Sequence, residues 1–166
     1  MKKKGELIKI AALVEQELGL HFESNRIEDV ERGILAALHE INIEETEKFI
    51  SNLAAASSIE PLFLKVLASH LTIGETYFFR EKPAMSLFIK MIMPEVIRKA
   101  EKEKRTIKIW SAGCSSGEEP YSLAIIIKEN FPGLNPSDFS IMATDISPKA
   151  INKAISGIYT EWSFRE

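Results

Sequence analysis

A short turn rich in small and acidic residues separates two apolar runs. Residues 110–122 read WSAGCSSGEEPYS, with glycines at Gly113 and Gly117. A glycine removes the side chain where backbone must approach a ligand, and it permits dihedral angles closed to other residues. The G-x-x-x-G spacing matches neither the dinucleotide fingerprint G-x-G-x-x-G nor a Walker A loop, so phosphate is not the expected ligand.

Two adjacent acids, Glu118 and Glu119, follow the second glycine. At the N-terminus of a helix they would occupy the place where the helix dipole and free N–H groups otherwise attract an anion. The pair therefore favours a cationic or amine-bearing ligand. The alternative is that the two acids only cap the helix, which is the commoner role of an arbitrary Glu-Glu pair.

A further acid, Asp145, ends the apolar run FSIMAT in the sequence ATDIS. In a doubly wound sheet, an acid after the second strand holds ribose hydroxyls through charge-assisted hydrogen bonds. By itself Asp145 could equally be the N-cap of a helix over SPKAINKAI. Together with the glycine turn it indicates an adenosine-type ligand that carries positive charge, and S-adenosylmethionine fits this description.

Strands and helices alternate through the C-terminal part of the chain. TIKIWS and FSIMAT are typical of short strands, whereas EEPYSLAIIIKEN and SPKAINKAI have helical patterns. This alternation predicts a parallel sheet with right-handed crossovers. In such a sheet the ligand lies beyond the carboxyl ends of the strands.

The first seventy residues have a helical pattern throughout, with apolar positions recurring every three or four residues. A first helix should end at Gly19. The last, starting near Pro61, has Ser58 as a candidate N-cap. The expected later helices are Ile27–His39, Thr46–Ala56 and Pro61–His70.

The segment LTIGETYFFRE, residues 71–81, interrupts this pattern and is expected to be a linker. Pro83 then opens a long helix, bent at Pro94, whose apolar face contains Leu87, Phe88, Met91 and Ile92. The predicted fold class is α/β, with an all-α N-terminal domain. The expected domains are 1–70, a linker and connecting helix at 71–105, and a strand-helix domain at 106–166.

Composition excludes several function classes. The 166 residues are 45% hydrophobic and 27% charged, with a net charge of -3, which gives no electrostatic reason to expect nucleic acid as partner. Apolar runs stay far below the roughly 18 residues that span a bilayer, so we expect no membrane insertion and a cytoplasmic location. Cys114 forms no metal-ligand cluster with the scattered histidines, and no metal site is expected.

Three segments, in this order, resemble the chemotaxis receptor glutamate methyltransferases, the CheR family: LTIGETYFFRE, IKIWSAGCSSGEEPYS and MATDISPKAINKAISGIY. The resemblance implies a small helical domain followed by the first half of a Rossmann-like class I methyltransferase domain. It also implies S-adenosylmethionine as cofactor, S-adenosylhomocysteine as product, and a methyl-accepting chemotaxis receptor or another signalling protein as partner.

The resemblance assigns roles in the linker. Thr76 and Arg80 would contact the cofactor, and Arg80 would be the catalytic residue that orients the acceptor carboxylate. Gly74 stands where the family usually carries asparagine, so a side-chain hydrogen bond to the cofactor would be absent or replaced by backbone. Tyr77 and Phe78 could wall the adenine or pack, whereas packing is expected for Phe79.

The resemblance also assigns roles in the glycine turn. The backbone from Ala112 through Gly113 to Gly117 would pass the methionine part of the cofactor. One of the two acids, Glu119 rather than Glu118, would hold its ammonium group. Asp145 would hold the ribose, and the aromatic residues nearest the turn, Trp110 and Tyr121, are expected in the core.

By this resemblance the reaction is methyl transfer from the sulfonium to a receptor glutamate, which forms a methyl ester. The acceptor carboxylate is already ionised, so positioning and water exclusion would suffice without a strong general base. The alternative is a non-catalytic relative that serves as a cofactor-sensing or protein-docking module.

Besides Gly74, two further features depart from the family pattern. In residues 25–40, Arg26 and Arg32 are outnumbered by acids, so steering toward an acidic receptor would be weak. The sequence also lacks the remaining strands of the family's sheet, so the chain is expected to be a fragment with little activity alone. The apolar surface of such a small sheet makes self-association a further expectation.

Overall fold

The structure is a computed structural model that describes residues 2–165, and these residues form two compact units. One unit contains residues 2–73 with 146–148. The other contains residues 74–145 with 149–165. Each unit has a buried core of its own, and each is described separately.

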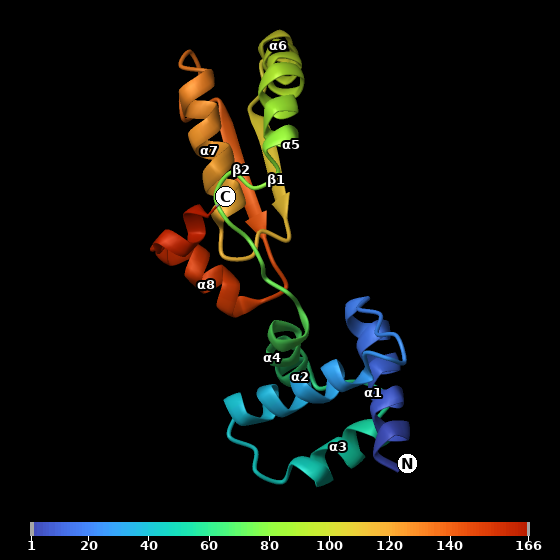
Figure 1. Cartoon of the computed structure of the whole chain (residues 1–166). Coiled ribbons are helices and arrows are strands. Elements are labelled where there is room, and N and C mark those ends of the chain that lie inside the picture. Colours follow the sequence, from blue (N-terminus) through green and yellow to red (C-terminus); the bar gives the residue numbers. More distant parts are fainter. Residues whose placement is uncertain (1, 166) are drawn as a thin grey trace. The chain divides into compact units, whose positions relative to one another are not determined.

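The first unit is built from helices α1 (Lys2–Leu18), α2 (Ile27–Glu40), α3 (Thr46–Ala55) and α4 (Pro61–Leu71) (Figure 1). Their apolar stripes form one core, because residues three and four apart share a helix face. Helix α1 ends before Gly19, which has a φ of 70° as expected for a helix stop. The core includes Leu7, Ile10, Val14, Val30, Ile34, Leu38, Ile50, Phe63 and Leu67.

The N-cap of α4 differs from the prediction. Glu60, and not Ser58, is the N-cap residue, and its carboxylate accepts hydrogen bonds from the N–H groups of Leu62 and Phe63 at 3.0 and 2.8 Å. Pro61 occupies the first turn, where its missing N–H costs nothing. The capping residue therefore directly precedes the proline.

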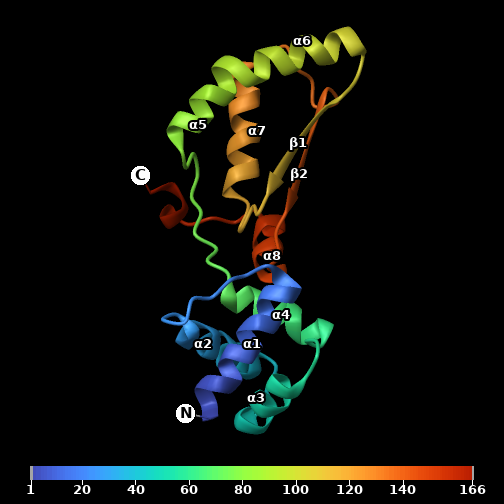
Figure 2. The same ribbon diagram turned by 90° about the vertical axis from the view of Figure 1, so that its right-hand side faces the viewer.

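The second unit contains α5 (Lys82–Leu87), the π-helical turn η1 (Phe88–Ile92), α6 (Met93–Glu103), β1 (Ile107–Ala112), α7 (Glu118–Asn130), β2 (Phe139–Thr144), α8 (Pro148–Ser156) and the 3₁₀ turn η2 (Glu161–Phe164). Figure 2 shows α7 running beside the two strands and α6 crossing near the end of the sheet where β1 begins. The predicted strand and helix segments of this unit are all present.

The two strands pair in parallel, with Ile107 opposite Phe139 and Ala112 opposite Thr144. The predicted parallel sheet is therefore confirmed. Side chains alternate between the faces of a strand. One face shares a core with α6 and α7, to which Met93, Ala100, Ile107 and Ile127 contribute buried side chains.

The prediction that Trp110 and Tyr121 belong to the core is wrong. Trp110 is 65% exposed, because it alternates with Ile109 and points away from the helix-covered face, and its indole N–H donates to Thr144 Oγ1 at 3.0 Å. Tyr121 is 41% exposed and donates its hydroxyl to the carbonyl of Ala154. The polar group of each ring therefore forms its hydrogen bond near the surface.

The connecting helix is divided by the π-helical turn, where the N–H of Met93 bonds to the carbonyl of Phe88. The turn ends two residues before Pro94, whose missing N–H cannot continue α-helical bonding. The predicted apolar face is wrong for Leu87, Met91 and Ile92, which are exposed, whereas Phe88 of that face packs against the core. The extra residue of a π turn shifts the register, and the packed face continues with Met93, Val96, Ile97 and Ala100.

None of the helices in residues 2–165 combines the length and the apolar character needed to cross a membrane.

Candidate functional site

The turn after β1 is held against the end of β2. The N–H groups of Gly113 and Cys114 both donate to the carbonyl of Thr144, at 2.8 and 2.9 Å. Gly113, Ser115 and Gly117 have positive φ angles of 74°, 47° and 96°. Alternating left-handed residues fold the chain tightly at the carboxyl ends of both strands, which is where ligands bind in open parallel sheets.

The two glycines of the turn have different surroundings. A Cβ built on Gly113 would have no atom within 4 Å. A Cβ on Gly117 would lie 2.8 Å from the Cβ of Ala154 and 2.8 Å from the hydroxyl of Tyr159. The backbone at Gly113 is therefore open to a ligand, whereas Gly117 is required by close packing within the unit.

Asp145 lies directly after β2 and is half-buried. Its Oδ2 accepts a hydrogen bond from the N–H of Ser115 at 2.7 Å. Helix α8 begins at Pro148, so the N-cap position belongs to Ser147 and not to Asp145. The acid predicted from the end of the second strand thus lies against the glycine turn.

The two adjacent acids occupy opposite environments. Glu118 is 1% exposed, and its carboxylate accepts from the hydroxyls of Ser116 and Ser163 at 2.7 and 2.9 Å. Glu119 is exposed, and its Oε1 accepts from the hydroxyl of Ser111 at 2.7 Å. Of the two, only Glu119 presents its carboxylate to solvent.

The linker segment (residues 74–81) is tied to the same turn at two points. The hydroxyl of Ser115 donates to the carbonyl of Gly74 at 2.9 Å. The N–H of Phe79 donates to the hydroxyl of Ser122 in α7, also at 2.9 Å. A Cβ on Gly74 would lie 3.0 Å from Ser115 Oγ, so a larger residue at this position would press on the serine.

Arg80 has an exposed side chain and contacts its own neighbours in the linker segment. Its Nη1 donates to the carbonyl of Glu75 at 2.6 Å, and its Nε lies 4.0 Å from a carboxylate oxygen of Glu81. The guanidinium also lies 5.7 Å from the ring centre of Tyr77. Thr76, between these partners, is half-buried.

Phe78 packs among aromatic residues that follow α8. It is 8% exposed, stacks on Phe164 with ring centres 4.6 Å apart, and meets Tyr159 edge to face at 4.9 Å. Phe79 is half-buried, and its ring centre lies 6.2 Å from that of Phe78. Both rings therefore pack within this unit.

Burial changes the titration of two groups beside the turn. Burial, with the carboxylate of Asp145 as a further cause, raises the pKa of the Cys114 thiol. Burial, with the carboxylate of Glu118 as a further cause, raises the pKa of Tyr159 to about 12. Both groups are thus kept protonated near neutral pH, and Tyr159 donates its hydroxyl to the carbonyl of Ser116 at 2.8 Å.

Sequence patterns did not single out the serines that connect these parts. Ser115 contacts Asp145 and Gly74, while Ser122 contacts the linker. Serines are common in turns for many reasons. The only sequence signal was that Ser115 lies between the two glycines of the turn.

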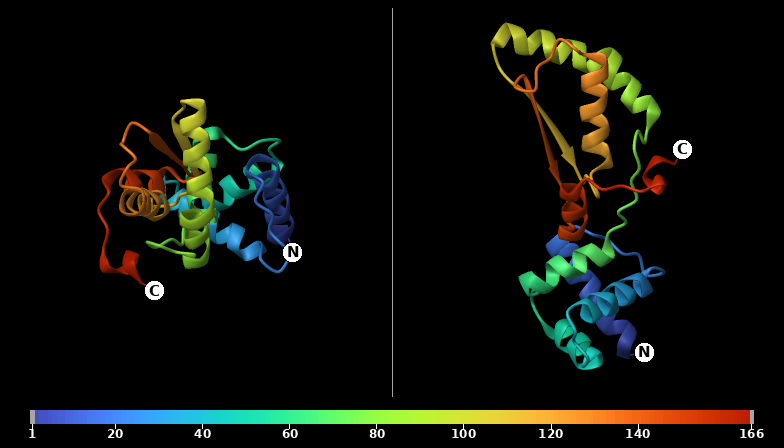
Figure 3. Two further views of the ribbon diagram at one scale, coloured as in Figure 1. Left: turned by 90° about the horizontal axis from the view of Figure 1, so that it is seen from above. Right: turned by 90° about the vertical axis from the view of Figure 1, so that its left-hand side faces the viewer.

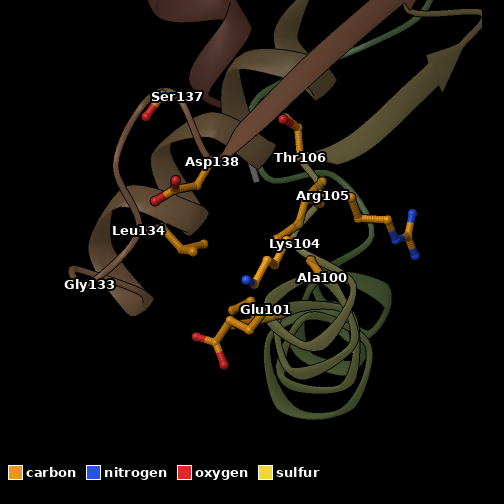
Figure 4. Close-up of a pocket in the computed structure, with 11 residues that line it drawn as sticks. Ala100, Glu101, Lys104, Arg105, Thr106, Gly133, Leu134, Ser137 and Asp138 are labelled. Atoms are coloured by element: carbon orange, nitrogen blue, oxygen red, sulfur yellow. The ribbon is translucent and has the colours of Figure 1, made fainter.

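A pocket of about 350 Å³ lies at the opposite end of the strands, beside Thr106 and Asp138 (Figure 4). Side chains of both charges line it, including Glu101, Lys104 and Arg105. It is separate from the carboxyl ends of β1 and β2, where the candidate site residues gather. Within residues 2–165, no cluster of His, Cys, Asp and Glu side chains could hold a metal ion.

Two chemotaxis protein methyltransferases illustrate what this chain is similar to. It is 31% identical to chemotaxis protein methyltransferase 2 of Vibrio cholerae over 150 residues, which are 90% of this chain and 51% of that protein. It is 32% identical to the chemotaxis protein methyltransferase of Borreliella burgdorferi over 161 residues, which are 95% of this chain and 56% of that protein. The chain thus spans about half the length of these relatives.

Residues 74–166 match the family described as CheR methyltransferase, SAM binding domain. The matched range starts at Gly74 and includes the linker segment, both strands, the glycine turn and Asp145. The cofactor indicated by this match is S-adenosylmethionine. The resemblance drawn from the sequence motifs is confirmed, and the chain belongs to the CheR methyltransferase family.

Proposed function

We propose that this chain is part of a methyltransferase that uses S-adenosylmethionine to methylate glutamate side chains of chemotaxis receptors. The observation that carries the proposal is the family match over residues 74–166, which contains the turn where Gly113, Glu119 and Asp145 gather. Relatives named chemotaxis protein methyltransferases support it.

The residues of the turn fit such a cofactor. The open space at Gly113 would admit a ligand against the backbone of Ala112 and Gly113. Glu119 would accept hydrogen bonds from an ammonium group, and Asp145 would accept them from ribose hydroxyls. The cofactor, when bound, supplies a methyl group activated by its sulfonium charge.

Glu118 has a different role from Glu119 in this proposal. Its buried carboxylate is already bonded to two serine hydroxyls, so it supports the turn and does not contact the ammonium group. This division follows the principle that a buried charge must be satisfied by hydrogen bonds. Glu119, and not Glu118, is therefore the proposed contact of the cofactor.

Arg80 would orient the acceptor carboxylate. A guanidinium presents several donors in a planar fork that matches a carboxylate. One donor already bonds to the carbonyl of Glu75, which fixes the direction of the side chain and leaves other N–H groups of the fork for an acceptor. Thr76 and the backbone of Gly74 would contact the cofactor from the same linker segment.

We further propose that the helical unit corresponds to the family's N-terminal domain, with domains at 1–70, 71–105 and 106–166. The last would be the first half of a Rossmann-like class I methyltransferase domain. A cytoplasmic location accords with this function. Self-association through the exposed sheet face, where Trp110 and Met142 are 65% and 57% exposed, remains part of the proposal.

The acceptor protein should be different from, or less acidic than, a standard chemoreceptor. On α2, Asp29 pairs with both Arg26 and Arg32, so neither arginine is left as an uncompensated charge for an acidic helix. Steering by long-range attraction would therefore be weak. Normal methylation of a strongly acidic receptor helix by the whole protein would contradict this part of the proposal.

Calorimetric titration of the chain with S-adenosylhomocysteine tests the cofactor site. Saturable binding that Asp145→Ala abolishes, and that Glu129→Ala leaves unchanged, would support it; Glu129 is an exposed acid at the far end of α7. Equal binding by both variants would overturn the assignment of Asp145. Binding by the whole protein without methyl transfer to any receptor would instead favour a cofactor-sensing module.

A further inference from the structure

The C-terminal strap (residues 159–165) returns to lie beside the linker segment (Figure 3). The carbonyl of Ser163 accepts a hydrogen bond from the N–H of Phe78 at 2.8 Å. The guanidinium of Arg165 lies 4.9 Å from the ring centre of Tyr77 and 3.5 Å from a carboxylate oxygen of Glu75. The strap thus contacts the linker along several consecutive residues.

The strap also contacts the glycine turn. The hydroxyl of Ser163 donates to Glu118 Oε1 at 2.9 Å, and the hydroxyl of Tyr159 donates to the carbonyl of Ser116 at 2.8 Å. Ser163 is 3% exposed and Glu118 is 1% exposed. A single buried serine therefore connects the turn through its side chain and the linker through its carbonyl.

Glu118 reaches the linker by a second route. Its backbone carbonyl accepts from the hydroxyl of Ser122 at 2.6 Å, and that hydroxyl accepts from the N–H of Phe79 at 2.9 Å. The consecutive amides of Phe78 and Phe79 are thus both fixed by groups bonded to Glu118. Arg80 is the next residue along the chain.

The burial of the Glu118 carboxylate requires a physical explanation. Burial of a carboxylate is costly unless hydrogen bonds satisfy it, and an apolar residue of similar size could often fill the same space at less cost. Here both oxygens of Glu118 are satisfied by serines from different segments. The cost is offset by a specific arrangement of the turn, strap and linker that non-directional apolar packing would not impose.

We propose that Glu118 and Ser163 are positioning residues: the Glu118 carboxylate holds Ser163, whose carbonyl fixes the amide of Phe78 beside the glycine turn. The backbone of Glu118 holds the amide of Phe79 through Ser122, so both routes together fix the start of Arg80. The hydrogen bonds themselves are observed in the structure, whereas their importance for methyl transfer rests on the proposed function. Neither residue needs to touch the cofactor.

Hydrogen exchange of the two linker amides, followed by NMR in the whole chain, tests this proposal. Glu118→Ala should speed exchange at Phe78 roughly thirtyfold, and the milder Ser163→Ala roughly fivefold. The Phe79 amide should change less, because an alanine at position 118 keeps the backbone carbonyl to which Ser122 donates. Glu118→Gln should restore most of the protection, because its amide can still bond to both serine hydroxyls. The matched control is Glu119→Ala, which should leave both amides as in the wild type.

Two results would overturn the proposal. The first is unchanged exchange of Phe78 in folded Ser163→Ala. The second is an equal rise in exchange at Phe78 and at Ile109 in β1, which would show uniform destabilisation in place of local positioning. If Glu118→Ala does not fold, Ser163→Ala and Glu118→Gln still decide between the outcomes.

The experiment separates this proposal from the proposed function. Exchange is measured without cofactor, so a wild-type chain that fails to bind S-adenosylhomocysteine would contradict the function and leave the positioning result intact. With binding present, Glu119→Ala should weaken cofactor affinity without changing linker exchange. Ser163→Ala should instead change the hydrogen exchange of the linker more than it changes cofactor affinity.

Discussion

The carboxylate of Asp145 accepts a hydrogen bond from the N–H of Ser115 at 2.7 Å. This bond ties the end of β2 to the turn after β1, two segments whose strands are neighbours in the sheet. Asp145 therefore serves the shape of the turn as well as its proposed role toward ribose. A carboxylate has two oxygens with several lone pairs, so the two roles are compatible.

Asp145→Asn should separate these two roles. An asparagine carbonyl can still accept from Ser115, so we expect the thermal midpoint to stay near that of the wild type. The loss of charge should weaken S-adenosylhomocysteine binding by about tenfold, because charge-assisted hydrogen bonds are about twice as strong as neutral ones. Calorimetry and thermal unfolding measure the two effects, and an unchanged affinity in Asp145→Asn would argue against a charged contact with the ligand.

Alanine substitutions at the two turn glycines should differ in which property they reduce more, stability or cofactor binding. Each places a Cβ on a left-handed residue, at a cost of about 1–2 kcal/mol. Gly117→Ala also brings that atom within 2.8 Å of Ala154 and Tyr159, so urea unfolding should show the larger loss of stability there. Gly113→Ala should be the more stable variant and the weaker cofactor binder. Equal stability of the two variants would contradict the different surroundings of these glycines.

Tyr159 should make stability depend on alkaline pH. Its pKa is raised from 10.0 to about 12 in the fold, so the neutral phenol is favoured and its contribution is complete below pH 10. That contribution is lost as pH rises toward 12. Tyr159→Phe cannot titrate, so the stability difference between wild type and variant should shrink over this interval in denaturant unfolding. A difference that stays constant from pH 9 to pH 12 would show that the phenol does not titrate as inferred.

Glu60 should give the helical unit an acid-sensitive cap. Hydrogen bonds from the N–H groups of Leu62 and Phe63 lower its pKa below 4.5, so the ionised form is favoured in the fold. The stabilisation is present above pH 4.5 and is lost as pH falls through the lowered value. Glu60→Gln should reduce this acid sensitivity, as measured by helical circular dichroism during acid titration. Glu44→Gln is a matched control on an exposed loop acid and should behave as the wild type.

Local sequence patterns predicted most secondary structure correctly. Strands β1 and β2, helix α7 and the parallel pairing follow from alternation, periodicity and glycine placement. The failures occur where residues distant in sequence decide the outcome. Trp110 is exposed because the helices cover only the other face of its strand, and Met91 and Ile92 are exposed because they lie in a π turn, which shifts the helix register.

The sequence by itself determined the family, the cofactor class and the turn at which Gly113, Glu119 and Asp145 gather, because these depend on residue types at short spacings. Only the tertiary structure distinguished Glu118 from Glu119 and Gly117 from Gly113. Each pair shares a residue type and a local motif, so no local pattern separates its members. Their roles differ because Ser163, Ala154 and Tyr159, about forty positions further along the chain, pack against one member of each pair and leave the other open.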